Sequence, residues 1–282
     1  MTFNYKNVYV GDTVTVAGVY EKNGPLKKYF DKTYNDLYFG EDSWEKAEIK
    51  AIKDNLALMS KKLGKQNSKV DLVIGADLLN QISASTYGCL GYGEAFIGVY
   101  GACSSSVLEM IIASNFIDSG QIENAIALVS SHNMTSEKQF RNPTEYGAPK
   151  PNSATFTATG SASIYLTNKK TDVRVECATL GKIIDYGEND PNDMGRVMTP
   201  GAVDTLIKHF EETGRTPQDY DLILTGDLGR YGKEILKDYM LEKYNYDMSK
   251  NYNDCGVMLY DLEKQSEVLA GGSGPVCSAL VN

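Results

Sequence analysis

Cys103 is the side chain in this sequence best placed for chemistry, because it lies at a turn between two expected elements. Residues 95–100 form an apolar segment typical of a buried strand, and apolar residues at helical spacing follow Cys103. Gly101 and Ala102 carry little or no side chain, so the backbone can turn tightly there. The first N–H groups of a helix lack intrahelical partners and lie at the positive end of its dipole. The turn therefore predicts an activated thiol or an anion site. The alternative is that Cys103 is only a small apolar residue at a tight crossing.

Charge and composition exclude several classes of protein. The 282 residues carry a net charge of −9, whereas a nucleic-acid binder needs a basic face, so no nucleic acid is expected as a partner. No apolar run approaches the length of a transmembrane helix, and the N-terminus does not resemble a secretory signal. The five widely spaced cysteines make no zinc pattern and suggest a reducing compartment. We expect neither a cofactor nor a dedicated metal site.

Alternating strand and helix patterns predict an α/β fold with a mainly parallel sheet and helices on its faces. Strand patterns occupy residues 8–19, 70–78, 95–100, 124–131, 160–167 and 173–180, and the alternation in the last two predicts antiparallel strands. The strand 124–131 delivers His132 and Asn133 at its carboxyl end. Residues 134–157 are polar and rich in turn formers, and a loop of that length in a compact domain is usually functional.

An internal repeat divides the chain into two similar halves. The segment Asp71-Leu72-Val73-Ile74-Gly75-Ala76-Asp77-Leu78 is echoed by Asp221-Leu222-Ile223-Leu224-Thr225-Gly226-Asp227-Leu228. Later in each half a turn of small residues carries a Cys-Ser pair, at Cys103 and at Cys277. The repeat predicts halves at residues 1–184 and 185–282, with strand ends and helix N-termini converging on a central cleft. The second half is the shorter one, so we expect some apolar surface to be left uncovered.

The duplicated plan with Gly-Ala-Cys-Ser at a strand-to-helix turn resembles the thiolase and ketoacyl-synthase superfamily. Longer stretches are similar to the stage V sporulation protein AD (SpoVAD) family of spore-forming bacteria. They include Tyr29-Phe30-Asp31-Lys32, Gly40-Glu41-Asp42-Ser43-Trp44-Glu45, Asp77-Leu78-Leu79-Asn80-Gln81-Ile82, Ser130-Ser131-His132-Asn133, Gln139-Phe140-Arg141-Asn142-Pro143, Thr225-Gly226-Asp227-Leu228-Gly229 and Ala270-Gly271-Gly272-Ser273-Gly274. The resemblance covers nearly the whole chain.

This resemblance implies a thiolase-like, duplicated five-layer αβαβα fold whose second half is incomplete at the C-terminus. It also implies a binding role. SpoVAD-like proteins bind dipicolinic acid or its calcium chelate and act with other SpoVA membrane proteins in moving it into the developing spore. They are associated with the spore inner membrane, here through partners. Proteins of this fold usually dimerise, which implies a homodimer with residues 95–100 as the candidate edge.

Catalysis is not expected, because a cysteine nucleophile needs a base within hydrogen-bond reach. Condensing enzymes of the superfamily usually take a histidine from the second half, yet the turn from Gly271 to Gly274 has none. Of the two histidines in the sequence, His209 lies within an expected helix and is interpreted as structural. The alternatives are a thiolase-like acyltransferase or condensing enzyme that uses Cys103, and a purely structural partner of the membrane proteins.

Dipicolinate is a flat ring with two carboxylates, so its site needs cationic or N–H partners and an apolar wall. The candidate ligand-binding residues are Cys103, Ser104, His132, Asn133, Lys138, Arg141, Thr225 and Arg230. For each of them the alternative is an ordinary structural, loop or surface contact. Asp77 and Asp227 are interpreted as caps of the helices that follow them, with coordination of calcium as the alternative.

Overall fold

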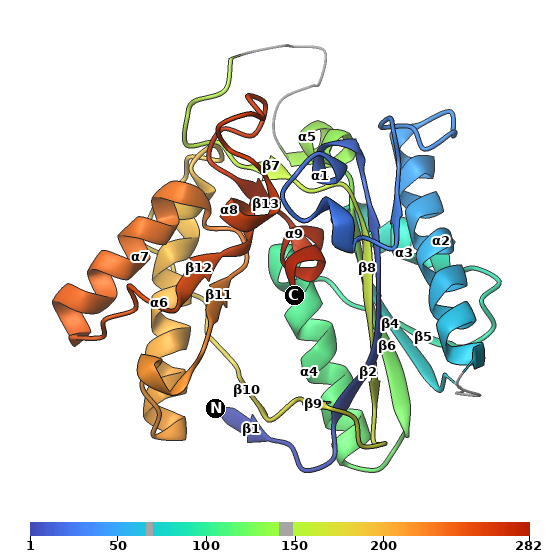
Figure 1. Ribbon diagram of the computed structural model, residues 1–282, viewed down its shortest axis with the longest axis horizontal. Helices are drawn as coiled ribbons and strands as arrows, with labels where there is room; N and C mark the ends of the chain where they lie inside the picture. Colours follow the sequence, from blue (N-terminus) through green and yellow to red (C-terminus); the bar gives the residue numbers. More distant parts are fainter. Residues whose placement is uncertain (66–69, 141–148) are drawn as a thin grey trace.

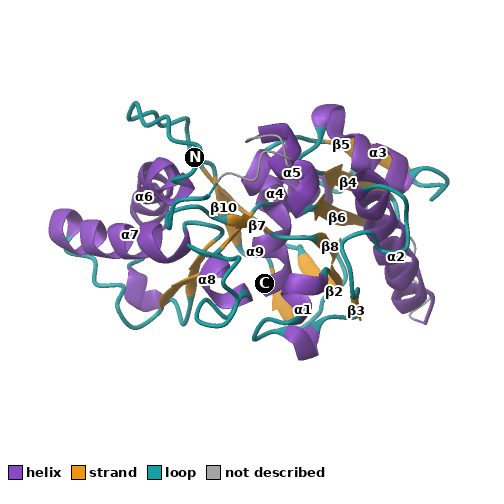
Figure 2. Ribbon diagram, turned by 90° about the horizontal axis from the view of Figure 1, so that it is seen from above, coloured by secondary structure: helices purple, strands orange, loops and turns teal. Residues whose placement is uncertain are grey.

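Five layers make up the computed structural model, which describes residues 1–65, 70–140 and 149–282. Helices α2 (Trp44–Lys65) and α3 (Ser83–Cys89) form one outer layer, and a seven-stranded sheet lies next to them. Helices α4 (Ser105–Asp118) and α9 (Pro275–Val281) form the central layer. Beyond it lie the strands β11 (Ile223–Thr225) and β12 (Tyr252–Asp254), then helices α6 (Met194–Thr213) and α7 (Gly229–Tyr244) (Figure 1). Figure 2 shows the two halves side by side from above.

The large sheet is mixed, whereas the sequence predicted a mainly parallel one. Its strands follow the order β3 (Lys32–Thr33), β2 (Tyr9–Ala17), β8 (Gly160–Thr167), β6 (Asn124–Ser131), β4 (Leu72–Ala76) and β5 (Ala95–Gly98), and β9 (Val173–Arg174) also pairs with β2. Strand β8 runs antiparallel to both of its neighbours, and the β4 pairs are parallel. Strands β4 and β6 are buried throughout, which suits their continuous apolar sequences.

Shorter elements complete the chain. They are β1 (Thr2–Asn4), α1 (Val19–Lys22), the 3₁₀ turns Lys27–Tyr29, Asn80–Ile82, Ala102–Ser104 and Pro217–Asp219, α5 (Asn133–Phe140), β7 (Phe156–Thr157), β10 (Cys177–Thr179), α8 (Cys255–Leu259) and β13 (Gly272–Ser273). Two sequence predictions were wrong here. Residues 134–140 belong to helix α5 and not to a loop, and β5 is an exposed edge strand rather than a buried one.

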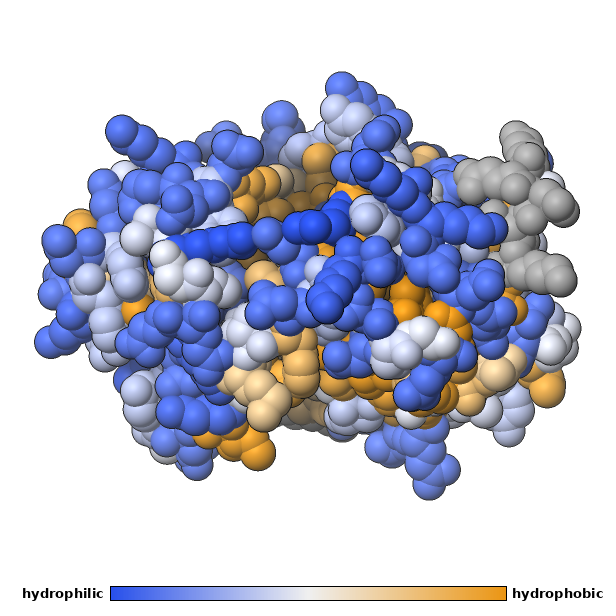
Figure 3. Space-filling view, turned by 90° about the horizontal axis from the view of Figure 1, so that it is seen from below, coloured by the Kyte–Doolittle hydropathy of each residue, from blue (hydrophilic) through white to orange (hydrophobic). Residues whose placement is uncertain are grey.

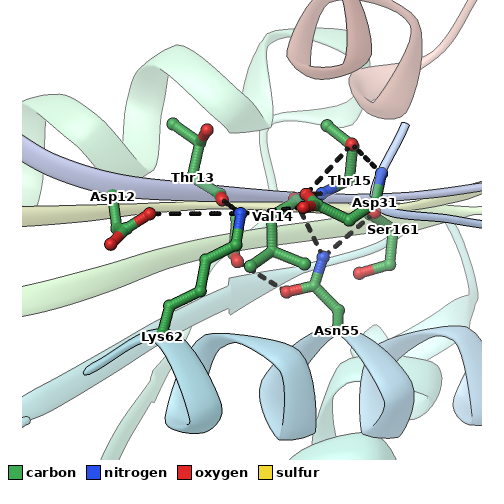
Figure 4. A network of polar contacts seen from close by, with 9 residues as sticks. Asp12, Thr13, Val14, Thr15, Asp31, Asn55, Lys62 and Ser161 are labelled. Atoms are coloured by element: carbon green, nitrogen blue, oxygen red, sulfur yellow. Dashed lines mark hydrogen bonds and ion pairs between the residues drawn. The ribbon is translucent and has the colours of Figure 1, made fainter. Parts of the chain in front are cut away.

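Polar side chains attach α2 to the sheet at defined points (Figure 4). The buried Asn55 amide donates to the carbonyl oxygens of Val14 and Ser161, both at 3.1 Å, and accepts from the Ser163 hydroxyl. Two turns along, the Lys62 ammonium donates to the Thr13 carbonyl at 2.6 Å and pairs with Asp31 at 2.8 Å. A single helix thus forms hydrogen bonds with both β2 and β8 beneath it.

The two aspartates that the predicted repeat pairs each follow a strand, Asp77 after β4 and Asp227 after β11, and they have different roles. Asp77 follows β4 and accepts the N–H groups of Leu79 at 2.8 Å and Ser85 at 2.7 Å, so it caps α3 as predicted. In the second half Asp254 takes that role, because it accepts the N–H groups of Leu228 and Gly229 at the start of α7. The boundary at residues 184 and 185 stays an interpretation of the repeat.

Contacts between distant segments join the halves. Strand β13 pairs in parallel with β7, and the Tyr260 hydroxyl donates to the buried carboxyl of Glu21. Burial raises the pKa of Glu21 to about 7, although hydrogen bonds from Tyr260 and the Thr159 N–H oppose that shift. The second half therefore cannot separate from the first without exposing a buried acid and its partners.

Apolar surface is also left uncovered, as the sequence predicted. On the lower face a hollow of about 690 Å³ lies between α4 and α6 and is lined mainly by apolar side chains (Figure 3). Met110 and Ile111 of α4 lie on one side, and Leu206 and Phe210 of α6 lie on the other.

We expect Asn55→Ala to lower the free energy of unfolding by about 3 kcal/mol, because two buried carbonyls and the Ser163 hydroxyl lose their partner. Urea denaturation measures this change. Lys53→Ala, on the exposed face of the same helix, is the control and should change stability by less than about 0.5 kcal/mol. Equal effects of the two substitutions would contradict the role given to Asn55.

Candidate functional site

Cys103 lies in the 3₁₀ turn Ala102–Ser104, directly before α4, as the sequence predicted. Ala102 has a φ of +48°, in the left-handed region that residues other than glycine rarely adopt. A strained backbone of this kind persists only where the surrounding structure enforces it, often at a functional site. The Ser104 N–H donates to the Gly101 carbonyl and the Ser105 N–H to that of Ala102, so these groups are not open to a ligand.

Two cavities meet at Cys103. One, of about 220 Å³, has an apolar wall of Leu78, Tyr100, Phe140 and Met194. The other, of about 240 Å³, lies toward the second half, between Ser104, Thr225 and Asp227. Cys103 lines both cavities, so it is partly exposed between a hydrophobic wall and a polar one.

Asp227 is the acidic group of the site. It is 7% exposed, its carboxylate accepts the Gly274 N–H at 3.3 Å, and it forms a hydrogen bond with the Cys103 thiol. Burial raises its pKa to about 6, with a further contribution from the Asp254 charge, while the thiol and the Gly274 N–H act in the opposite direction. The sequence predicted a helix cap here. That interpretation was wrong, because the bonds of Asp227 go to Gly274, 47 residues away, and to the thiol.

Ser136 is a second residue that sequence reasoning missed. It is 2% exposed on α5, it lines the apolar cavity, and its hydroxyl has no partner among the described residues. A buried hydroxyl without a partner is costly unless a ligand or water satisfies it. Ser136 lies three residues after Asn133, so in a helix the two side chains share one face. Because residues 134–157 were predicted as a loop, this spacing was not used.

His132 is not part of the cavity. Its Nε2 lies 2.7 Å from the Leu37 carbonyl oxygen, and its Nδ1 accepts the Met134 N–H, which defines a neutral ring that donates through Nε2. Burial lowers its pKa to about 4. The other histidine, His209, lies on α6, and its two ring nitrogens contact the hydroxyls of Thr179 and Tyr220. Neither histidine is therefore in place to act as a base for Cys103.

The remaining predicted residues separate into three groups. Thr225 lines the polar cavity, and its hydroxyl donates to Asp254 at 2.7 Å. Asn133 is buried with its amide nitrogen unpartnered in the described part of the chain, and its N–H donates to Thr159. Lys138 pairs with Glu45 on the surface, and Arg230 reaches the Leu262 carbonyl, so neither lines the cavities.

Arg141 lies outside the described residues. Among the described ones, no lysine, arginine or histidine lines either cavity at Cys103. Among the described residues, the Asp227 carboxyl is therefore the charged group that lines these cavities.

Comparison with known proteins places the whole chain in one group. A family model described as stage V sporulation protein AD (SpoVAD) matches residues 1–282. Stage V sporulation protein AD of Bacillus subtilis (strain 168) is 43% identical over 276 residues, which cover 97% of this chain and 80% of that protein.

Solved structures agree on the fold. A variant of OleA from Xanthomonas campestris superposes with a TM-score of 0.62 at 14% identity and covers 99% of this chain and 89% of that chain. A cerulenin-bound OleA gives a TM-score of 0.62 at 12% identity, with 99% and 88% covered. The predicted thiolase-like fold is thus confirmed.

The buried neutral ring of His132 gives a pH-dependent term in stability. Its pKa is about 4 in the folded chain and 6.5 in the unfolded one, so the unfolded chain binds more protons between these values. Stability from this residue is complete above pH 6.5 and falls by about 3 kcal/mol as the pH drops to 4.

Urea unfolding of the parent and of His132→Gln across this range measures that term. Glutamine can still donate to the Leu37 carbonyl but does not titrate, so the difference between the two proteins should shrink as the pH falls. Glu21 and Glu48, whose pKa values burial raises to about 7 and about 8, titrate in both proteins and cancel. A constant difference would contradict the assignment.

Proposed function

The chain belongs to the stage V sporulation protein AD family, and we propose that it is a non-catalytic protein that binds dipicolinic acid as its calcium chelate in the cavities at Cys103. In this role it acts in the uptake of dipicolinate into the developing spore. None of the described helices is long and apolar enough to cross a membrane, so we propose that it reaches the spore inner membrane through other SpoVA proteins.

Two features on opposite sides of Cys103 support this proposal. One cavity has an apolar wall, and the other contains the buried carboxyl of Asp227. Tyr100, Phe140 and Met194 provide a surface for a flat aromatic ring. Asp227 faces the other cavity, and in its charged form it repels a free dicarboxylate. A calcium ion between the ligand and Asp227 reverses that repulsion, because calcium prefers several oxygen ligands.

The positions of the two histidines support the proposal that the protein is not a catalyst. Both lie in the described part of the chain, and both are held by other groups, away from the thiol. Asp227 is the group that contacts the thiol, and a carboxylate beside a thiol opposes the negative charge of a thiolate. The alternative, an acyltransferase or condensing enzyme, predicts acyl transfer from acyl-CoA to Cys103, and mass spectrometry of the intact chain detects that adduct.

We expect Asp227→Asn to weaken binding of the calcium chelate about tenfold or more, because an oxygen ligand loses its charge. Binding of free dipicolinate should instead weaken in the parent as the pH rises through about 6, where Asp227 loses its proton, and Asp227→Asn should remove that dependence. Calorimetric titration with each ligand measures both effects.

Asp172→Asn is the charge-matched control, because Asp172 is exposed and outside both cavities. Arg141→Ala tests the predicted ligand-binding residue that lies outside the described residues. If Asp227→Asn changes the affinities for chelate and free acid equally, the bridging role of calcium is wrong. If neither ligand binds, the proposed function fails.

We also propose that the protein is a homodimer joined at β5. This strand ends the sheet, and Phe96, Tyr100, Tyr87 and Leu90 are exposed around it. An exposed edge strand with apolar neighbours is a template for pairing with another strand.

Phe96→Asp should convert the dimer to a monomer, because it places a charge in the apolar contact, and sedimentation velocity measures the change. Val173→Asp, at an exposed apolar position on β9, is the control and should leave the dimer intact. A dimer that survives Phe96→Asp, or a parent that is monomeric, would rule out this interface.

A further inference from the structure

Helices α6 and α7 leave a groove on the outer layer of the second half. Their N-terminal turns touch at Gly195 and Gly232, where a Cβ on either residue would lie within 3 Å of the backbone of the other helix. From that crossing the two helices diverge (Figure 1). The segment 184–188 lies against them and closes one side of a hollow of about 370 Å³. We propose that this groove binds a basic, amphipathic segment of a partner protein.

The walls of the groove have the composition of a protein interface. Three tyrosines line it, Tyr186 from the segment and Tyr239 and Tyr244 from α7, together with Ile184 and Ile235. Tyr186 is 73% exposed and Tyr239 is 39% exposed, and the neighbouring Ile183 is 97% exposed. Tyrosine is enriched at interfaces and among the residues that dominate binding energy. A contiguous exposed patch of such side chains is typical of an interaction site.

The charge of the groove selects a basic partner. Residues 185–193, Asp-Tyr-Gly-Glu-Asn-Asp-Pro-Asn-Asp, carry four carboxylates and no lysine or arginine, and Asp185 and Glu188 are the two that line the groove. Arg196 on α6 pairs with Glu188 at 2.9 Å, and Lys182 pairs with Asp204 at 2.9 Å, so these pairs leave no net charge. Asp185 makes no ion pair with the described residues.

A lysine or arginine over the exposed tyrosine rings gains a cation–π contact as well as the attraction of these acids. An anionic lipid surface is repelled by the same charges. A protein segment with basic and apolar side chains is therefore the occupant that fits both properties of the groove.

The same acidic segment reaches the cavity at Cys103. Pro191 and Met194, at its far end, line the apolar cavity beside Cys103. A partner in the groove thus contacts the segment that borders the cavity. A partner in this position could deliver the ligand to the cavity or receive it from there. This role of the partner rests on the proposed function.

The test uses the full chain without dipicolinate, so that it does not depend on ligand binding. The probe is a short helical peptide of leucine and lysine at amphipathic spacing, titrated by calorimetry at physiological salt. We expect saturable binding that Tyr186→Ser and Tyr239→Ser each weaken about tenfold. Asp185→Lys should weaken it similarly through charge alone. Protection from hydrogen exchange on binding should be confined to residues 184–188 and 235–244.

Matched controls separate this site from general attraction to an acidic protein. Tyr29→Ser and Tyr38→Ser change tyrosines that are 67% and 45% exposed elsewhere, and they should bind the peptide as the parent does. Thermal unfolding shows whether each variant is folded. Equal weakening by the controls, or equal binding of a peptide with glutamate in place of lysine, overturns the proposal. If the parent self-associates and Tyr239→Ser abolishes that association, the groove binds a second copy of this chain. That result would also overturn the proposal.

Discussion

The close packing of α4 against α9 is the contact on which the site depends. The buried hydroxyls of Ser106 on α4 and Ser278 on α9 lie 3.0 Å apart, and such small side chains let the two helices approach closely. Each helix follows a turn of small residues, at Cys103 and at Gly274. Because the helices meet near their starts, the turns before them meet as well. The thiol from one half is thereby brought to the carboxyl of the other.

Several acidic side chains are buried in the interior of the protein. Glu21, Glu48, Glu109 and Asp227 are all buried, and burial raises the pKa of each carboxyl. Glu21 and Glu48 are held by hydroxyl donors, Tyr260 for Glu21 and Ser130 and Thr135 for Glu48. Both oxygens of Glu109 lack a side-chain partner in the described part of the chain. Of the four acids, Asp227 is the one that lines a cavity at Cys103, so a ligand or metal ion in that cavity can reach it.

The sequence predicted the parts of the site that local pattern determines. The turn at Cys103 follows from small residues between a strand and a helical pattern, and Thr225 follows from the repeat. The prediction from sequence failed where a contact between residues far apart in the chain determines the position of a side chain. His132 follows a strand, as predicted, whether its ring faces a cavity or the core. Its contact with the carbonyl of Leu37, 95 residues earlier, holds the ring in the core. Lys138 was expected in a loop, but α5 directs it to Glu45 on α2. Neither contact has a signal in the local sequence.

Asp77 and Asp227 show how a duplicated fold acquires a site. Both follow a buried strand, and in the first half the aspartate satisfies the N–H groups of the next helix. In the second half Asp254, at the end of β12, accepts those N–H groups together with the Thr225 hydroxyl. The cap at α7 is thus supplied from a neighbouring strand. Asp227 is released from local structure, and its carboxyl turns to Gly274 and Cys103 instead. The contact between the Asp227 carboxyl and the Cys103 thiol therefore depends on a difference between two halves whose sequences are alike at this position.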